Sequence, residues 1–438
     1  MAGGTWEKQD KVRPGAYVNF KSKRKALAPL GERGVATMAL SLPWGPEKKV
    51  LKINVDDDLS NLLGINITDD NALLIREVFK HARTLMLYRL NEGNRATATL
   101  ENLTINAKYS GTKGNNITIV IQTNIDSTSD EIDVVTMFDG DKVDKQVVKT
   151  IKDLKSNEYV EFKGEGALKT TAGLPLKGGD NGTATNKDYI DYLNNIELYD
   201  FDTMGITSKD SQIKAIAVNF MKRLNNEEGK KVQAVLENYP EADSECIISV
   251  KNGVILSDGT EITADKAVAF VTGATAGANI NQSNTYLVYD GAIDVDTRYK
   301  NKEINEILRN GEVIFTINNE KVVIEQDINT FKSFTETKKK DYRKNRVVRT
   351  LFAVNNGTKS LWGLNYLGKG DNDDDGRNLY KKDVIKFLET LQKMKALQNV
   401  ITEDVVVVKG EDSDSVVSKL AVQPVDAMEK LYMDVEVE

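Results

Sequence analysis

Apolar residues recur along this chain at two spacings, every second residue in some regions and every third or fourth in others. Runs rich in β-branched residues occupy 34–40 and much of 96–162, where Gly, Asn and Asp separate them. Such runs predict strands, and in 96–162 they predict a small antiparallel β-sandwich. A helix is expected at about 70–90, because Asp70 is a suitable N-cap and four apolar residues follow at helical spacing, namely Leu74, Val78, Ala82 and Leu85.

From residue 187 onward the two spacings alternate along the chain. This alternation predicts an α/β layer built around a mostly parallel sheet. A further amphipathic helix is expected at about 380–397 and a strand at 405–408. The other helices are expected at 187–196, 209–226, 264–272 and 302–310, and the strands at 232–236, 246–250, 285–289, 313–317 and 321–325.

Six regions are expected along the chain. A length of 438 residues exceeds what one core supports, so several domains are expected. The glycine-rich stretch 164–182 marks one boundary, and the expected fold class is a multidomain α+β protein. The regions are an N-terminal arm at 1–25, an N-terminal α/β region at 26–95, the β-sandwich at 96–175, an α/β domain at 176–330, an α/β C-terminal domain at 331–419 and an extended C-terminal strand arm at 420–438.

The two ends of the chain carry β-forming residues at alternate positions and have opposite charge. Residues 1–25 hold seven Lys and Arg against two acids, and residues 402–438 hold ten acids against three Lys. Chain ends are usually polar and irregular, whereas an unpaired strand invites pairing with another chain. We therefore interpret the ends as arms that pair between subunits of a polymer. The residues expected to make this contact are Val12, Tyr17 and Phe20 at one end and Leu431, Tyr432, Val435 and Val437 at the other.

Composition excludes several classes of protein. The net charge is −7, whereas a nucleic-acid-binding surface needs a basic balance, so no nucleic acid is expected as a partner. A single cysteine, Cys246, excludes an internal disulfide framework and fits synthesis in a reducing cytoplasm. The first residues lack the apolar core of a signal peptide and no run reaches 18 apolar residues, so no membrane insertion is expected.

Two loops have the spacing of ligand-binding motifs but lack necessary residues. Residues 363–370 have the spacing of a phosphate loop without the Ser or Thr that holds Mg²⁺, and a strand leading into a surface turn is the alternative. Residues 371–376 resemble the first half of a calcium loop, but Lys382 stands at its twelfth position, where a bidentate Glu is needed. A solvated loop is the alternative there. No cofactor and no metal ion are therefore expected.

Nucleophilic hydrolysis lacks its usual base in this sequence. The only histidine, His81, is expected in a helix next to Phe79, where a packed structural role is the simplest interpretation. One His and one Cys cannot make a zinc site, and Cys246 is expected to be a buried strand residue. We therefore predict no catalytic residue and no enzymatic activity.

The most basic segment is 338–349, which holds seven Lys and Arg and one acid. Such a run is either a solvated face or an electrostatic contact with an acidic partner, and the C-terminal arm of a neighbouring subunit has the required charge. Nucleic acid fits less well, because no aromatic platform accompanies the run. The residues of this expected interface are Lys338, Lys339, Lys340, Arg343, Lys344, Arg346 and Arg349.

Several segments resemble phage tail sheath proteins, and together they span nearly the whole chain. Residues 107–117 resemble the start of the family's β-sandwich, and 176–182 resemble the segment that leads into its subtilisin-like domain. The most specific matches are 324–330 and 344–346. The resemblance is strongest to sheaths of contractile tails and tailocins of Gram-positive hosts, of the PBSX and diffocin type. Residues 11–17, 366–377 and 422–432 fit the family as well.

This resemblance implies a fold, partners and a mechanism. Residues 176–330 would form a subtilisin-like α/β domain without a catalytic triad, and the arms would add strands to a sheet of adjacent subunits. The chain would polymerise helically around an inner tail tube protein, with 331–438 nearest the tube and with baseplate and tail terminator proteins as further partners. Joints are expected near 21–25 and 410–418. Contraction would drive the tube through the bacterial envelope, so the expected location is a virion or tailocin particle.

Other classes remain alternatives at this point. A sheath of another contractile injection system is the close structural alternative, although a single chain disfavours the secretion-type sheaths, which resemble two-protein assemblies. An α/β hydrolase-like or nucleotide-dependent enzyme is disfavoured by the missing base and the incomplete phosphate loop. A β-rich surface or adhesive protein is disfavoured by the lack of a signal peptide.

Overall fold

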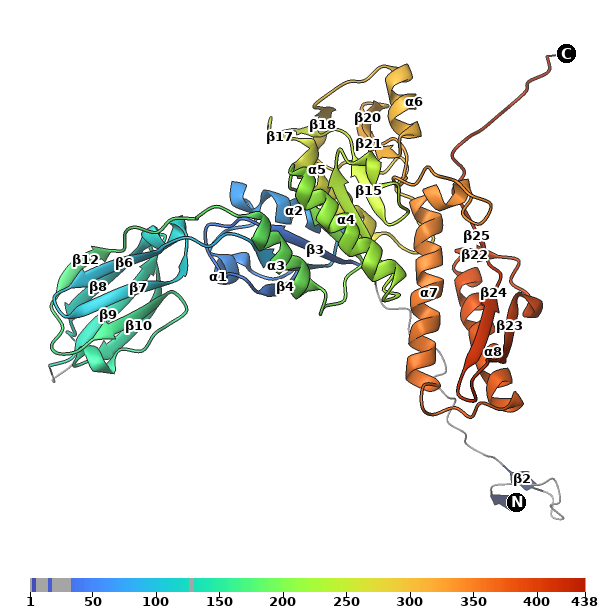
Figure 1. Ribbon diagram of the computed structural model, residues 1–438. Coiled ribbons are helices and arrows are strands. Elements are labelled where there is room, and N and C mark those ends of the chain that lie inside the picture. Colours follow the sequence, from blue (N-terminus) through green and yellow to red (C-terminus); the bar gives the residue numbers. More distant parts are fainter. Residues whose placement is uncertain (1, 5–14, 18–32, 126–129, 438) are drawn as a thin grey trace. The chain divides into compact units, whose positions relative to one another are not determined.

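The computed structural model describes residues 2–4, 15–17, 33–125 and 130–437, which are coloured along the chain in Figure 1. These residues form two compact units. The central unit contains the described residues between 33 and 355 together with 424–437, and the C-terminal unit contains 356–423 and the described residues of the N-terminus. Helices and sheets occur in both units, so the expected multidomain α+β class is confirmed.

A seven-stranded sheet forms the middle of the central unit. Every neighbouring pair of its strands is parallel except β4 with β5, which confirms the expected mostly parallel sheet. Strands β3, β4 and β5 of this sheet precede the β-sandwich in the sequence, and the others follow it. Its order is β19 (Glu312–Val313), β15 (Ile247–Val250), β14 (Gln233–Glu237), β13 (Thr203–Ile206), β3 (Val35–Leu40), β5 (Thr84–Arg89) and β4 (Val50–Asn54).

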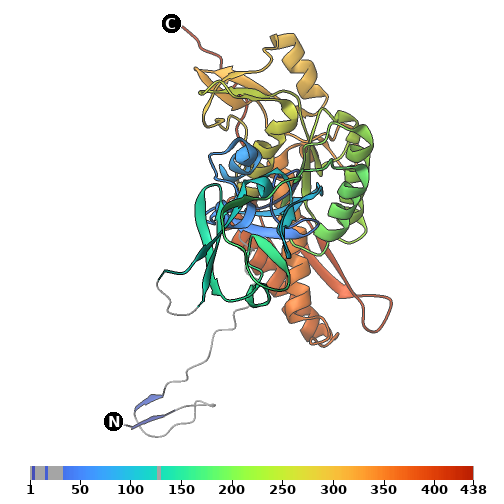
Figure 2. The ribbon, with the colours of Figure 1, turned by 90° about the vertical axis from the view of Figure 1, so that its left-hand side faces the viewer.

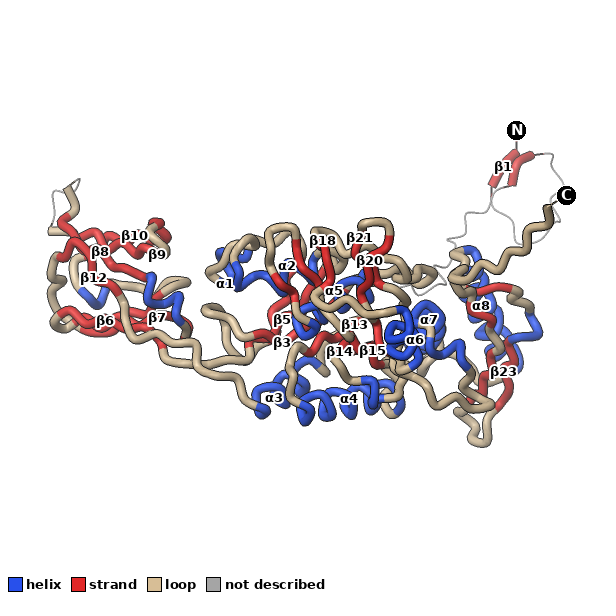
Figure 3. The backbone as a smooth tube through the Cα atoms, turned by 90° about the horizontal axis from the view of Figure 1, so that it is seen from above, coloured by secondary structure: helices blue, strands red, loops and turns tan. Residues whose placement is uncertain are grey.

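Helices cover both faces of this sheet (Figure 3). Successive strand residues point to opposite faces, so Ala36 and Met38 pack in the cluster of α2 and α5, whereas Ala39 packs in that of α3 and α4. Burial on both faces explains the continuous apolar runs of the parallel strands. The bounds are α1 (Leu59–Leu63), α2 (Leu73–Phe79), α3 (Asn186–Ile196), α4 (Ser211–Asn226) and α5 (Ala264–Gly277).

The helix expected at 70–90 is much shorter than predicted. Helix α2 ends at Phe79, and residues 84–89 form β5 near the centre of the sheet. Leu85, Leu87 and Tyr88 are fully buried there. Strand pairing on both sides and burial on both faces favour the extended conformation, which overrides the helical spacing of the apolar residues.

The strand expected at 285–289 was also wrong. Only Val288 makes an isolated bridge, to Val323, and the strand of this region is β18 (Ala292–Val295). It pairs with β16 (Val254–Leu256), which also pairs with β17 (Glu261–Ile262). Helix α6 (Asn301–Arg309) is followed by Gly311 at φ 84°, and then by the hairpin of β20 (Phe315–Asn318) and β21 (Lys321–Ile324).

The β-sandwich of the central unit consists of two antiparallel sheets, as expected (Figure 2). Their facing side chains share one buried cluster that includes Ile105, Ile119 and Val160. One sheet has the order β10 (Asp141–Val148), β9 (Ile132–Phe138), β8 (Ile117–Thr123), β12 (Thr171–Pro175), and the other β11 (Val160–Gly164), β7 (Leu103–Ser110), β6 (Arg95–Leu100).

The sandwich is inserted between β5 and α3, and its first and last segments lie side by side. Asn91 Nδ2 donates a hydrogen bond of 2.7 Å to the carbonyl oxygen of Asn181 and one of 2.9 Å to that of Leu42. A Cβ on Gly182 would lie 2.1 Å from the carbonyl oxygen of Glu92, and the φ of Gly182 is +60°. Only glycine fits this close backbone approach in a left-handed conformation.

The C-terminal unit is built on two helices and short strands. Helix α7 (Asn345–Asn365) begins in the central unit and continues here, and α8 (Asp374–Lys393) follows it. The expected helix at 380–397 is confirmed, although it begins earlier. A Cβ on Gly357 would lie 2.1 Å from the ring of Phe387, so glycine permits the close packing of these helices. The strands are β22 (Leu397–Gln398), β23 (Val405–Lys409), β24 (Val416–Leu420) and β25 (Gln423–Pro424).

Candidate functional site at the chain ends

The two candidate catalytic side chains are packed, His81 partly buried and Cys246 fully buried. His81 follows α2, outside the helix in which it was predicted, and its ring lies edge-on to Phe270 with centroids 5.1 Å apart. Burial lowers the pKa of His81. Cys246 is buried with its Sγ 3.2 Å from Ser244 Oγ, and burial raises its pKa to about 11, so a thiolate is disfavoured. Neither group is placed to serve a nucleophilic reaction.

The two loops with ligand-like spacing have structural roles. Gly363 lies within α7, so the strand expected there was wrong, and 366–370 follow the C-terminus of a helix, where the dipole disfavours a phosphate. Asp373 is the N-cap of α8 and accepts a hydrogen bond of 2.8 Å from the amide of Gly376. Within the described part of the chain, no three His, Cys, Asp or Glu side chains gather at a metal-binding distance, and no helix has the length and apolarity of a membrane span.

The N-terminal arm is described at two short segments. Strand β1 (Ala2–Gly4) pairs in parallel with β2 (Gly15–Tyr17). Tyr17, which was expected to contact a neighbour, ends β2. Val12 and Phe20, its two expected companions, lie outside the described residues.

The C-terminal arm is the most exposed apolar segment of the described chain. Every residue from Lys430 to Val437 is exposed, and the segment forms neither helix nor strand. A strand needs a partner to supply its ladder hydrogen bonds, and no strand of the described residues pairs with this segment. The four residues expected at a subunit contact have exposed fractions of 84% for Leu431, 88% for Tyr432, 72% for Val435 and 92% for Val437.

The hairpin of β23 and β24 presents a second exposed apolar surface, in the C-terminal unit. Val405 is buried beneath the hairpin, whereas Val406, Val408 and Val417 are exposed on its outer face. The two strands form a sheet of their own, so each has an outer edge without a neighbouring strand in the described chain. In 410–418, where a joint is expected, Gly410 N donates to Ser415 O at 2.9 Å and β24 begins at Val416.

The root of the C-terminal arm is fixed to the central unit by Glu429. Its carboxylate accepts a hydrogen bond of 2.9 Å from Thr285 Oγ1 and one of 2.7 Å from Gln326 Nε2, and it forms an ion pair with Lys344. Burial raises the pKa of Glu429, but the hydrogen bonds and the charge of Lys344 outweigh it and hold the pKa below its usual value.

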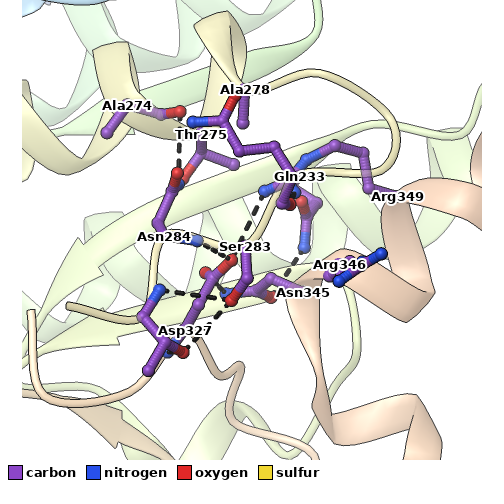
Figure 4. Close-up of polar contacts among 12 residues, drawn as sticks. Gln233, Ala274, Thr275, Ala278, Ser283, Asn284, Asp327, Asn345, Arg346 and Arg349 are labelled. Atoms are coloured by element: carbon purple, nitrogen blue, oxygen red, sulfur yellow. Dashed lines mark hydrogen bonds and ion pairs between the residues drawn. The ribbon is translucent and has the colours of Figure 1, made fainter. Parts of the chain in front are cut away.

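A buried polar cluster, the Asp327 junction, supports these donors (Figure 4). Asp327 accepts hydrogen bonds of 2.8 Å from Asn345 Nδ2 and 2.9 Å from the amide of Asn284. The Arg349 guanidinium lies 3.7 Å from the Asp327 carboxylate and donates to the carbonyl of Gln282 at 2.6 Å. Burial lowers the pKa of Arg349 to about 10, against the influence of Asp327. The junction joins the end of β21, the loop after α5 and the start of α7.

The predicted basic interface does not form one surface. Arg349 lies inside the Asp327 junction, and Lys344 pairs with Glu429 of its own chain. Lys338 pairs with Glu245, and burial lowers the pKa of Arg343. Lys339 and Lys340 are exposed, and Arg346 is partly buried.

The described part of the chain thus presents exposed apolar residues at its C-terminal end and on the hairpin of β23 and β24. Four family models match consecutive segments: the tail sheath protein Gp18 domain III N-terminal region at 33–90, the phage tail sheath protein beta-sandwich domain at 91–181, the phage tail sheath protein central domain at 182–330 and the phage tail sheath C-terminal domain at 337–438. The chain belongs to the phage tail sheath protein family, whose members are structural proteins, and it is a structural subunit of a contractile tail sheath.

Particular relatives cover the full length of the chain. It is 40% identical to the phage-like element PBSX protein XkdK of Bacillus subtilis (strain 168), over 100% of both chains. It is 47% identical to the sheath tail protein of Desulfitobacterium hafniense, whose crystal structure matches 96% of this chain and 99% of that one with a TM-score of 0.86. The contracted helical sheath of the anti-feeding prophage shares the fold, at 13% identity, 97% and 98% coverage and a TM-score of 0.58.

The sequence did not indicate that Glu429 and its three donors form one site. The signal was nevertheless present, because the segments 324–330, 344–346 and 422–432 each resembled the family and each contributes one member, Gln326, Lys344 and Glu429. Their distance apart in sequence hid the contact. Thr285 was missed because 285–289 was predicted to be a strand.

Proposed function

We propose that this chain polymerises helically around an inner tail tube through exchange of its arms, and that contraction drives the tube through the bacterial envelope. The carrying observation is an exposed, unpaired apolar segment at 430–437 in a chain that also presents an open two-stranded sheet. Each feature leaves backbone or apolar groups that pairing with another subunit would satisfy. A contact of this head-to-tail kind does not close on itself and so builds a helix.

The hairpin of β23 and β24 is the acceptor that we propose for the arms. An added strand gains backbone hydrogen bonds, each with a net contribution of about 0.5–1.5 kcal/mol, and covers exposed apolar surface. Val406, Val408 and Val417 supply that surface. An acidic C-terminal arm beside a basic N-terminal arm would also place opposite charges across neighbouring strands, which favours the pairing.

Contraction in this proposal uses no nucleotide, because the energy would come from interfaces between subunits that all become more stable as the sheath shortens. Further proposed partners are the inner tail tube, near 331–438, and the baseplate and tail terminator proteins. The proposed location is a virion or tailocin particle after synthesis in the host cytoplasm. We also retain as proposals the six regions defined from the sequence, a subtilisin-like architecture for 176–330 and an outward role for the exposed Lys339 and Lys340.

Electron microscopy of the purified chain across a concentration series tests the proposal. Hollow striated tubes are expected for the full chain, and none for chains that lack 1–20 or 431–438. The second deletion keeps β24 and Glu429, so the deleted chains should remain folded by circular dichroism. Normal tubes from both deletions would contradict the proposal. If the full chain alone forms no tubes, co-expression with tube protein decides between a templated sheath and a protein that does not polymerise.

A further inference from the structure

We infer that Glu429 is the positioning residue of the C-terminal arm, in that its carboxylate fixes the point at which the arm leaves its own subunit. The inference rests on the proposed function, because it treats 430–437 as an arm. Glu429 is the last residue with a described side-chain hydrogen bond before a segment that is exposed throughout. The contact therefore sets where the free segment begins.

Three donors from three separate parts of the central unit converge on this carboxylate. Thr285 lies in the loop after α5, Gln326 follows β21, and Lys344 directly precedes α7. The side chains of Glu429 and Lys344 are 10% and 20% exposed, so solvent screens the ion pair less than at an open surface. Hydrogen bonds to a charged group are stronger than those between neutral groups, so the three together hold a single acidic side chain selectively.

The Asp327 junction holds the donors in place before the arm arrives. The Thr285 hydroxyl accepts a hydrogen bond of 2.9 Å from the amide of Asp327 while it donates to Glu429. Lys344 forms a bridge with Ile328, and the next residue, Asn345, donates to Asp327 at 2.8 Å. A receptor that is already ordered loses little conformational entropy when it binds.

A fixed root limits the space that the arm searches. The segment 430–437, which begins after Glu429, reaches about 26 Å when fully extended. If the contact opened, the free segment would begin several residues earlier, and its tip would spread over a larger volume. The local concentration of the tip at a neighbouring acceptor strand would fall, and assembly would need more protein.

The substitution Glu429→Gln in the full chain tests the inference, and Glu436→Gln is the matched control. Both changes remove one negative charge near the same end, but Glu436 is exposed within the arm. Hydrogen–deuterium exchange of free subunits should rise in peptides that cover 424–430 for Glu429→Gln alone. The critical concentration for tube formation should rise about tenfold for Glu429→Gln and less than about twofold for Glu436→Gln.

Reversal of both charges of the ion pair distinguishes a positioning role of Glu429 from a general effect on stability. The double variant Lys344→Glu with Glu429→Lys should restore much of the protection and of the assembly, whereas each single reversal should lose both. The inference would be overturned if Glu429→Gln left the hydrogen–deuterium exchange of 424–430 unchanged. It would also be overturned if that exchange rose while the critical concentration for assembly stayed the same. If the chain without 431–438 assembles normally, the arm function itself fails. Protection of 424–430 in free subunits would then still report whether the Glu429 contact forms.

Discussion

Asn345 donates a hydrogen bond of 2.8 Å to the carboxylate of Asp327, so the first residue of α7 is joined to the segment that follows β21. The two residues belong to the segments 324–330 and 344–346, which were the most specific signs of the family in the sequence. Asn345 also donates to the carbonyl of Ile328 at 2.9 Å and accepts from Gln233 at 3.0 Å. The two segments that most resemble the family therefore meet in a buried polar contact at the start of α7.

Asp327→Asn should destabilise the central unit by about 3–5 kcal/mol, because it leaves the buried guanidinium of Arg349 without its counter-ion. The free energy of unfolding, measured by urea denaturation of free subunits, checks this value. Glu101→Gln is the control, since Glu101 and Lys169 form an exposed pair on the sandwich, and its cost should stay below about 1 kcal/mol. Equal costs for the two variants would contradict the assignment.

Gly273→Ala should destabilise the protein by about 1–3 kcal/mol, because the added Cβ would lie 2.2 Å from the carbonyl oxygen of Val78 on α2. Gly363→Ala, in α7, is the matched helix variant, with no atom within 4 Å of its Cβ position. It should be neutral or stabilising by up to about 1 kcal/mol, since alanine has the higher helix propensity. Thermal unfolding of both variants gives the comparison, and a neutral Gly273→Ala would refute close packing of α5 on α2.

The Glu429 contact should open in acid. Its pKa in the folded chain lies below the usual 4.5, so its contribution is fully present above that pH and is lost as the pH falls through the folded value. A spin label on Met428→Cys, an exposed residue next to Glu429, should therefore gain mobility as the pH falls below 4.5 through the lowered pKa of Glu429. The same label in Glu429→Gln should be mobile already at neutral pH, and a label that is equally mobile in both chains at pH 7 would count against the contact.

Cys246 should react slowly with thiol reagents in the folded chain. Burial raises its pKa to about 11 from the usual 9.0, so the thiolate at pH 8 is about a hundredfold scarcer than for a free thiol. A colourimetric disulfide reagent should label it at least about a hundredfold faster after unfolding in urea. Rapid labelling of native protein would place Cys246 at the surface instead.

Val408→Lys should block assembly without affecting the folded subunit. Val408 is exposed on the outer face of the hairpin, so a lysine there costs the subunit little but disturbs a surface that we propose is covered in the polymer. Val147→Lys on strand β10 of the sandwich is the control, because Val147 has a similar exposed fraction, 47% against 48%. The critical concentration from sedimentation should rise only for Val408→Lys, and assembly of both variants at the normal concentration would exclude the hairpin face.

The sequence predicted the elements whose pattern is local. The sandwich strands within 96–162, helices α3 to α6 and the mostly parallel sheet followed from spacing alone. Residues 84–89 were mistaken for helix because Leu85 fits a helical stripe, and only pairing with β3 and β4 makes them a strand. Helix α7 was missed because its basic start indicated a charged surface and Gly363 indicated a turn. Gly357, another of its glycines, is explained only by the ring of Phe387 on the next helix, α8.

The exposed C-terminal segment could be predicted, because β-forming residues at alternate positions of a chain end stand out in composition. The site that holds the C-terminal arm could not, because Thr285, Gln326, Lys344 and Glu429 meet only after the sheet and α7 have formed. A partly buried carboxylate looks the same in sequence as the exposed acids around it. The same holds for the basic run, in which Arg349 is interior and Lys339 is exposed.

The side-by-side start and end of the sandwich make it a replaceable module. Because Asn91 contacts the carbonyl of Asn181 directly, a turn of about two to five residues could close the chain where the sandwich now leaves it. The parallel sheet, the junction at Asp327 and both arms would keep their connectivity. Such a chain can gain, lose or exchange the inserted domain in evolution while the sequence that folds its core stays the same. An engineer could graft a foreign domain at the same two residues.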